Sequence, residues 1–227
     1  MYTLYIANKN YSSWSLRPWV LMRALGVPFE ERLMLFEGGS NRERFRAFAP
    51  NGRVPCLHDA DTVVWDSLAI AEYLAESHAA VWPADRIARA WARCAAAEMH
   101  SGFDALRARC SMTCGQRVEL RGIDPALLAD VGRIDELWTE GRGRFGGPYL
   151  AGPAFTAVDA FYAPVVFRVQ TYDLPLSDSA CAYADLMLAH PAMREWYDAA
   201  LAETARDNDH EREIAAVGTV RADYRAA

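Results

Sequence analysis

The chain has 227 residues, of which 52 % are hydrophobic, and a formal net charge of −6 at pH 7. This length allows one large domain or two small ones with a sizeable core, and the apolar content excludes a disordered chain. Because surfaces that bind nucleic acid are normally basic, the acidic balance argues against such a partner. No apolar run approaches the roughly 20 residues of a membrane-spanning helix, and no signal-peptide pattern opens the chain, so we expect a cytoplasmic protein without a membrane partner.

The cysteines give no sign of a metal site. They are Cys56, Cys94, Cys110, Cys114 and Cys181. None forms a C-x-x-C pair, and no histidines stand at the spacing of zinc ligands, so we expect no metal. The odd number of cysteines also fits reduced thiols in a reducing compartment.

The first half of the chain alternates between strand and helix patterns. Residues 2–7 are β-rich, and the apolar positions that follow recur at helical spacing up to Gly26. Further strands are expected over 28–36, 54–59 and 62–65, and further helices over 41–48 and 66–77. This β-α-β-α-β-β-α order predicts a small α/β domain with a mixed sheet over residues 1–77.

The second half is predicted to be helical. Residues 78–84 show no periodicity and contain a Trp-Pro stop, so they form a candidate linker. Helices are expected over 86–110, 124–142, 156–170, 178–190 and 190–204. These patterns predict an all-helical domain over residues 85–206, followed by a polar tail with little pattern over 207–227.

The first motif that can carry chemistry is the turn Ser12-Ser13-Trp14-Ser15 between the first strand and the first helix. Unpaired N–H groups and the dipole of a helix N-terminus attract anions, and they lower the pKa of a bound thiol from about 8.5 toward neutrality. A serine hydroxyl in this turn can donate one more hydrogen bond to the sulfur. Taken alone, a serine at this position is more often a plain helix cap.

The second motif is Arg53-Val54-Pro55 followed by Asp66-Ser67. A proline that opens a strand needs an edge, a bulge or a cis bond, and a cis bond turns the backbone groups of Val54 outward toward a peptide ligand. At the next helix start, Asp66 can hold an ammonium group while Ser67 and backbone amides hold a carboxylate, although a plain cap is again the ordinary alternative. Together the two motifs predict a peptide-like ligand with a thiol at one end and an α-amino acid group at the other, which is the layout of glutathione.

In these features the chain resembles the cytosolic-type glutathione S-transferases, and among them the serine-type, zeta-like bacterial members. The similar stretches are YSSWSLRPW, FAPNGRVPCL, the hairpin that runs into DSLAIAEYL, the Trp-Pro linker and TAVDAFYAP. In the last of these, Thr156 and Asp159 match the capping box of the family's helical domain. The resemblance extends from residue 1 to about residue 205.

The resemblance implies a thioredoxin-like glutathione-binding domain, an all-helical substrate domain and a homodimer. It also implies glutathione as the co-substrate, whose thiolate attacks a hydrophobic electrophile after activation by a serine and a helix N-terminus. The residues implied to bind glutathione are Trp14, Arg53, Val54, Pro55, Asp66 and Ser67. An isomerase of the maleylacetoacetate type and a non-catalytic binding protein of the same fold are the alternatives.

The resemblance offers two serines as the donor to the thiolate. Counting four residues back from Arg17 selects Ser13, whereas aligning the zeta-like pattern SSCSWR on SSWSLR selects Ser12, and we prefer Ser13. Trp14 stands where zeta members carry a cysteine, which argues against a mechanism through a protein–glutathione disulfide. Tyr11 leaves a tyrosine-type mechanism as a minor option.

A site for the second substrate is predicted on the expected helix 86–110. Met99, His100 and Phe103 fall on one face there, with Met112 beyond, and would form an apolar wall. Packing between helices is the other interpretation of such a stripe. Zeta-type isomerases hold an acidic substrate with an arginine late in the helix after the capping box, and Arg168 lies near that position but out of step with it.

Overall fold

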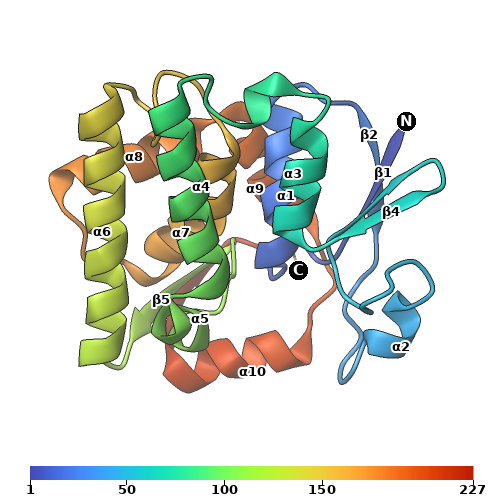
Figure 1. Ribbon diagram of the computed structural model, residues 1–227. Helices are drawn as coiled ribbons and strands as arrows, with labels where there is room; N and C mark the ends of the chain where they lie inside the picture. Colours follow the sequence, from blue (N-terminus) through green and yellow to red (C-terminus); the bar gives the residue numbers. More distant parts are fainter. Residues whose placement is uncertain (227) are drawn as a thin grey trace.

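The computed structural model describes residues 1–226 and divides into a sheet domain and a helical domain (Figure 1). The strands are β1 (Tyr2–Ile6), β2 (Phe29–Leu33), β3 (Cys56–Asp59), β4 (Thr62–Trp65), β5 (Gln116–Leu120) and β6 (Gly218–Asp223). The helices are α1 (Ser13–Ala24), α2 (Arg42–Phe45), α3 (Ser67–Ala75), the 3-10 turn η1 (Ala79–Val81), α4 (Arg86–Ser101), α5 (Asp104–Arg109), α6 (Pro125–Phe145), α7 (Ala157–Tyr172), α8 (Asp178–Ala189), α9 (Pro191–Ala202) and α10 (Asn208–Val217). Within the described residues, no helix is both long and apolar enough to span a membrane.

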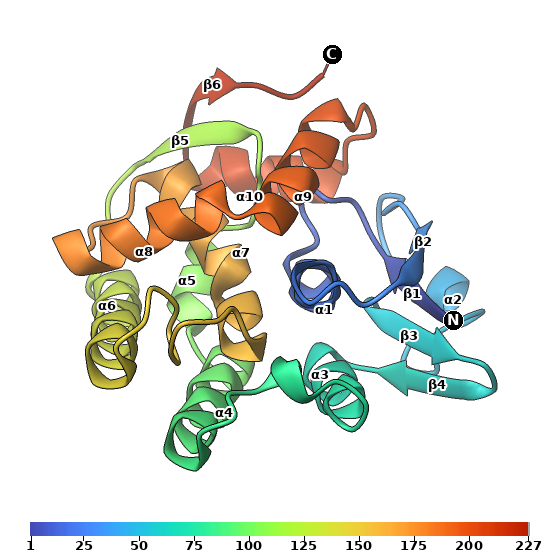
Figure 2. The ribbon, with the colours of Figure 1, turned by 90° about the horizontal axis from the view of Figure 1, so that it is seen from above.

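The N-terminal domain has the mixed sheet that the sequence predicted. Its strand order is β2-β1-β3-β4, with β1 parallel to β2 and antiparallel pairing elsewhere. Because side chains alternate along a strand, Leu4 and Ile6 enter the core shared with α1, whereas Tyr5 points to the opposite face and stacks on Phe48 at 4.4 Å between ring centroids. Figure 2 shows α1 and α3 on the side of this sheet that faces the helical domain. The arrangement is thioredoxin-like, as expected.

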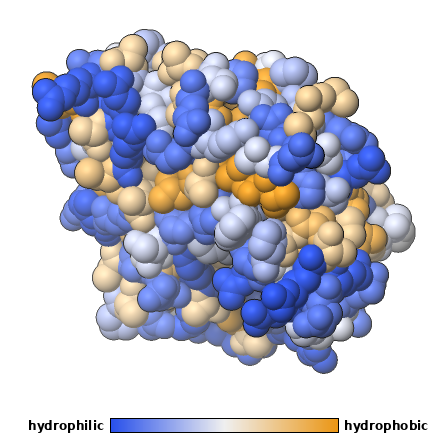
Figure 3. All heavy atoms as spheres, turned by 45° about the vertical axis from the view of Figure 1, so that its right-hand side comes forward, coloured by the Kyte–Doolittle hydropathy of each residue, from blue (hydrophilic) through white to orange (hydrophobic). Residues whose placement is uncertain are grey.

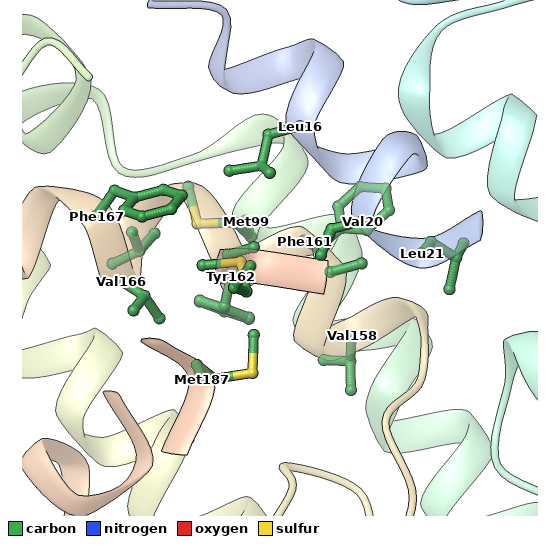
Figure 4. Close-up of a cluster of buried hydrophobic side chains, with 14 of the residues drawn as sticks. Leu16, Val20, Leu21, Met99, Val158, Phe161, Tyr162, Val166, Phe167 and Met187 are labelled. Atoms are coloured by element: carbon green, nitrogen blue, oxygen red, sulfur yellow. The ribbon is translucent and has the colours of Figure 1, made fainter. Parts of the chain in front are cut away.

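The helical domain is organised around α7. Nearly every residue of this helix is buried, since it packs against α4 and α8 within its own domain and against α1 of the sheet domain. Figure 4 shows the apolar side chains that meet there; they include Leu16, Met99, Phe161, Tyr162 and Met187. One core therefore holds both domains together.

The first turn of α7 is fixed by the predicted capping box. Asp159 is fully buried, and its carboxylate accepts hydrogen bonds from the backbone N–H of Thr156 at 2.9 Å and of Leu150 at 3.0 Å. The hydroxyl of Tyr183 on α8 donates to the same carboxylate at 3.0 Å. This group thus joins a loop and two helices in the centre of the domain.

The expected single helix over 86–110 is wrong, because it is interrupted at Gly102 and Phe103. Gly102 has a non-helical backbone, and Phe103 lies in the left-handed region with a φ of 61°. The interruption lets the Phe103 side chain enter the core, and Arg107 on α5 donates to the Gly102 carbonyl at 2.9 Å. The chain therefore turns between α4 and α5, and α5 takes a direction of its own (Figure 1).

The segment expected to form a polar tail with little pattern, 207–227, contains α10 and β6 within its described residues. Asp207 caps α10 by accepting from the N–H of His210 at 3.2 Å, and Ile214 is the buried residue of the helix. β6 then pairs antiparallel with β5, so the helical domain contains a small two-stranded sheet. In Figure 1, α10 runs beneath both domains, from the side of α2 to the side of α5 and β5.

Candidate active site

A cavity of about 460 Å³ lies between the two domains, above α10. The sheet domain lines it with the serine turn, the β2–α2 segment and the loop before β3. The helical domain lines it with α5, the loop after α5 and α7, and α10 closes a third side. The lining residues are Tyr11, Ser12, Ser13, Trp14, Phe36, Asn41, Arg42, Phe45, Gly52, Arg53, Val54, Arg107, Ser111, Met112, Arg168 and His210.

A smaller hollow of about 150 Å³ continues this cavity along the sheet domain. It shares Trp14, Arg53 and Val54 with the cavity and is otherwise lined by Asn51, Pro55, Asp66 and Ser67. Every residue predicted to contact glutathione, from Ser12 to Ser67, therefore lines one of the two. The combined space is a cleft with the serine turn near its middle.

The two candidate serines differ in their hydrogen bonds. The Ser12 hydroxyl donates to the Oγ of Ser15 at 2.7 Å, and that oxygen also accepts from the N–H of Ala7 at 3.2 Å. The Ser13 hydroxyl has no partner among residues 1–226, although the residue lines the cavity at the first position of α1. The proton of Ser12 is thus engaged within the protein, whereas that of Ser13 is available to a ligand.

The turn before β3 brings backbone groups to the cleft. Gly52 has a φ of 65°, and a Cβ on it would lie 2.8 Å from the carbonyl oxygen of Arg42, so the turn requires glycine. The Val54–Pro55 peptide bond is cis, which agrees with one of the options that the sequence left open. Both residues line the smaller hollow.

The start of α3 supplies the far end of the cleft. Asp66 has a φ of 75° and caps the helix by accepting from the N–H of Leu68 at 2.9 Å. Its side chain is 45 % exposed, so the carboxylate keeps a face open to the hollow. The Ser67 hydroxyl beside it is buried and lies 3.4 Å from a guanidinium nitrogen of Arg17.

Arg17, the residue from which the position of Ser13 is counted, packs behind this cleft against Trp14 and Ser67. Its guanidinium lies 4.1 Å from the centroid of the Trp14 ring and 5.0 Å from that of Phe161. It is almost fully buried, and its Nε makes no hydrogen bond among the described residues. Burial lowers the pKa of this guanidinium, and the nearby charges of Arg107 and Arg168 act in the same direction.

The predicted second-substrate residues Met99, His100 and Phe103 do not line the cavity. Met99 and Phe103 belong to the core, where Figure 4 shows Met99 among apolar side chains from several helices. The Nε2 of His100 lies instead 3.6 Å from the Asp66 carboxylate, and its ring meets the edge of Trp14 at 5.3 Å. The helical stripe was therefore mainly core, and the histidine belongs to the Asp66 end of the cleft, where burial lowers its pKa.

The outer wall of the cavity is formed largely by residues that the sequence did not single out. Met112 was named from the sequence, whereas Arg107, Ser111 and Phe36 were not. Arg168 was expected to lie out of step with the substrate-binding arginine of zeta-type isomerases, but it does line the cavity. Its Nε donates to the Cys110 carbonyl at 2.6 Å. Because α7 is buried on all sides, no apolar face in the sequence could show where this arginine points.

Positive charge dominates the cleft. The charged side chains of its larger part are Arg42, Arg53, Arg107 and Arg168, and within the described residues no carboxylate lines that part. Burial and the charge of Arg107 lower the pKa of Arg168 to about 10, so it is charged at neutral pH. In the part of the chain that the structure describes, no three His, Cys, Asp or Glu residues gather as metal ligands. The arginines and hydroxyls of the cleft suit it to anion binding and hydrogen bonding.

Tyr11 is buried and already occupied. Its hydroxyl donates to Glu211 on α10 at 2.6 Å and accepts from Arg225 at 2.9 Å. Burial and the hydrogen bond to Glu211 raise the pKa of this phenol well above its ordinary value. The minor option of a tyrosine-type donor therefore finds no support in the geometry.

Figure 3 shows the molecule from the side of the sheet domain, where the surface is mostly hydrophilic with apolar residues gathered across its middle.

Comparison with known proteins gives matches in both domains. The family model for the N-terminal domain of glutathione S-transferases matches residues 11–77, and that for the C-terminal domain matches residues 84–199. No curated protein is significantly similar to the chain.

Many solved structures share the fold. A glutathione transferase homologue from Burkholderia GL BGR1, with bound glutathione, is 23 % identical, with a TM-score of 0.63 over 88 % of this chain and 97 % of that one. Glutathione transferase Omega 3C from Trametes versicolor is 17 % identical, with a TM-score of 0.68 over 95 % and 89 %. A diazinon-metabolizing glutathione S-transferase from the silkworm Bombyx mori is 21 % identical, with a TM-score of 0.66 over 88 % and 97 %.

The solved structures, at these identities, establish the common fold. The two family models go further, since the ranges they match take up more than half of the 227 residues and meet close to the predicted linker. The chain therefore belongs to the glutathione S-transferase family.

Proposed function

We propose that the protein is a serine-type glutathione transferase, in which Ser13 donates a hydrogen bond to the thiolate of glutathione. The observation that carries the proposal is the Ser13 hydroxyl at the N-terminus of α1, which lines the cleft and has no partner among residues 1–226. A thiol bound there gains a donor and the positive end of the helix dipole. A lowering of the thiol pKa by about 2 units corresponds to about 2.7 kcal/mol of thiolate stabilisation.

The remainder of glutathione is proposed to follow the cleft toward α3. Val54 presents backbone groups to the cysteinyl unit, and the Asp66 carboxylate pairs with the ammonium of the γ-glutamyl end. Ser67 and the N–H groups at the start of α3 face the carboxylate of the same end. Arg53, at the junction of the hollow and the cavity, pairs with the glycyl carboxylate.

The kinetic test compares Ser13→Ala with Ser12→Ala, using glutathione and an aryl chloride. We expect kcat/KM to fall about 100-fold or more for Ser13→Ala, since the removed donor acts on the reacting sulfur. Ser12→Ala serves as the matched control, with a loss of less than about tenfold, because that hydroxyl is engaged with Ser15. The reverse ranking would assign the role to Ser12, and absence of glutathione binding in the wild type would leave only a binding protein of the same fold.

A second candidate is an isomerase that acts on acidic substrates, favoured by the position of Arg168 in the cavity wall. Arginine pairs with carboxylates through two parallel hydrogen bonds, and Arg107 adds a second cation to the wall. Turnover of maleylacetone, compared with an aryl chloride and a hydroperoxide, separates the candidates. If the isomerase is correct, Arg168→Met raises KM for maleylacetone tenfold or more and leaves KM for the aryl chloride within about threefold.

The proposal also includes a homodimer and a cytoplasmic location. The exposed side chains of Trp65 on β4 and Ile87 on α4 are large apolar groups available to a second copy. The five cysteines are all free, which suits a reducing compartment. Sedimentation equilibrium tests the dimer, and Trp65→Ser together with Ile87→Ser should shift the equilibrium toward the monomer.

A further inference from the structure

His210 on α10 forms a fixed pair with a buried carboxylate at the edge of the cavity. Its Nδ1 lies 2.5 Å from the Oδ2 of Asp207, and the same carboxylate accepts from the backbone N–H of His210 at 3.2 Å. Asp207 is only 4 % exposed. Its carboxylate is held by the backbone at the start of α10 and by the imidazole ring of His210. The pair therefore has one orientation, in which Nδ1 is bound and Nε2 faces away from Asp207.

The imidazole ring also stacks on two aromatic side chains. It stacks on Tyr11 at 5.0 Å with an interplanar angle of 22°, and on Phe36 at 5.3 Å with an angle of 24°. The ring lines the same cavity as Ser12 and Ser13, and within residues 1–226 its Nε2 makes no hydrogen bond. The imidazole is therefore placed to donate a hydrogen bond or a proton to a molecule in the cavity.

The helix that carries His210 is fastened to both domains. The carboxylate of Asp209 accepts from the N–H of Gly39 at 3.1 Å on the sheet side, and the hydroxyl of Ser111 donates to Glu213 at 2.6 Å on the helical side. Between these points, Glu211 accepts from Tyr11 at 2.6 Å. The helix that carries the imidazole is thus held at the cavity by contacts with both domains, beneath which it runs in Figure 1.

We propose that His210 is the proton donor for electrophiles whose attack by the thiolate creates an oxyanion, such as epoxides and α,β-unsaturated ketones. The sulfur forms a bond to carbon. In the epoxide a C–O bond breaks and its electron pair stays on oxygen, whereas in the enone the C=C pair forms the new C=C bond of an enolate while the carbonyl π pair moves onto oxygen. The Nε2–H of the imidazolium transfers its proton to that oxygen or to the carbon of the resulting enolate, and the neutral ring is reprotonated by solvent. Asp207 holds the ring in the orientation that leaves Nε2 free of the carboxylate.

The proposal rests on the proposed transferase function but separates from it by substrate. Displacement of chloride from an aryl ring releases an anion that needs no proton, so this reaction requires the thiolate and not the donor. Asp207, Asp209 and Tyr11 lie beside His210, and Tyr11 is bonded to Glu211 and Arg225. The charged side chains that line the same cavity are Arg42, Arg53, Arg107 and Arg168. The proton taken up by substrate is therefore assigned to the imidazole, since the Tyr11 hydroxyl is occupied.

The experiment measures kcat for a phenyl epoxide and for an aryl chloride in His210→Gln. General acid catalysis is worth about 10²–10⁴-fold, so kcat for the epoxide should fall at least 100-fold, against no more than about threefold for the chloride. Arg212→Gln, a solvent-facing change on the same helix, is the matched control and should leave both rates as in the wild type.

A second variant keeps the test sharp if His210→Gln disturbs the fold. His210→Ala leaves a space of the size of an imidazole beside Tyr11 and Phe36, so added imidazole should restore epoxide turnover at least tenfold and leave chloride turnover as it is. Equal losses on both substrates, no loss on the epoxide, or a wild type that turns over the chloride but neither epoxide nor enone would each overturn the proposal. A wild type that does not bind glutathione would overturn the transferase function itself.

Discussion

At the scale of the residue, the cleft shows which functional side chains can be predicted from a sequence. Ser13 and Asp66 stand in short motifs at the ends of elements, where turn and cap chemistry restricts the residue type, and both line the cleft. Arg168 and His210 could not be found in this way. The first is on a helix buried all round, and the second is on a helix whose buried face is marked by Ile214 alone.

His100 gives a prediction about pH and stability. Burial lowers the pKa of this imidazole below 6.5, and the charges of Arg17 and Arg107 add to the effect, while Asp66 opposes it. The folded protein therefore binds fewer protons than the unfolded chain near and below pH 6.5, so this contribution to stability is complete above pH 6.5 and is lost as the pH falls through the folded-state pKa.

The measurement is the free energy of unfolding in urea at pH 7.5 and at pH 5.5. His100→Gln should lose less stability between the two values than the wild type does. His190, whose pKa is also lowered by burial, contributes to the slope in both proteins and cancels in the comparison. Identical slopes would mean that His100 titrates as it does in the unfolded chain.

At the scale of the element, the sequence predicted helices and strands better than it predicted their ends. Strands β1 to β4 and helices α6 to α9 follow clear periodicity or caps. The turn at Gly102 and Phe103 was missed because the apolar spacing continues through it, while a single left-handed residue redirects the chain. Strand β5 was missed because only Gln116 and Val118 are buried in it, too few for an alternating pattern to stand out.

Helix α7 carries the second prediction. The Asp159 carboxylate accepts from Thr156 and Leu150 through the backbone and from the hydroxyl of Tyr183, using both oxygens. An asparagine has one acceptor oxygen, so Asp159→Asn leaves a buried donor facing an NH₂ group. At pH 7.5, above the value of about 6 to which burial raises the pKa of this carboxyl, we expect a loss of about 2–4 kcal/mol in the free energy of unfolding.

The control for this helix is Thr156→Ser, which keeps a hydroxyl at the N-cap and should cost less than about 1 kcal/mol. Both variants are measured by urea unfolding at the same pH. If Asp159→Asn were as stable as the wild type, the buried hydrogen bonds of the capping box would not support α7.

At the scale of the whole molecule, the two-domain organisation was predictable, but the way the two domains pack against each other was not. The change from strand patterns to helical patterns near residue 80 marks the division. The contacts that join the domains come from isolated positions far apart in the chain, such as Arg17 on Phe161 and Glu203 on the loop after β1. No local pattern connects such positions, and for the same reason the outer wall of the cleft became visible only in the fold.

Glu203 provides the prediction at this scale. Its carboxylate accepts from the backbone N–H groups of Lys9 at 2.7 Å and Asn10 at 3.1 Å, just ahead of the serine turn. Glu203→Ala leaves these donors without partners and frees the loop that positions Ser13, so we expect about 2–3 kcal/mol less stability and a higher KM for glutathione.

The readouts are thermal unfolding and steady-state kinetics, with Glu195→Ala, an exposed glutamate on α9, as the control. A variant that loses stability but keeps the wild-type KM for glutathione would show that Glu203 joins the domains without positioning the turn.

The most direct test of the central claim is the pKa of glutathione bound to the protein, followed by ultraviolet absorbance of the thiolate. We expect a value about 2 units below the ordinary thiol pKa of about 8.5 in the wild type and in Ser12→Ala, and a return toward the ordinary value in Ser13→Ala. A bound thiol that titrates alike in the wild type and Ser13→Ala would contradict the assignment of Ser13 as the donor to the thiolate.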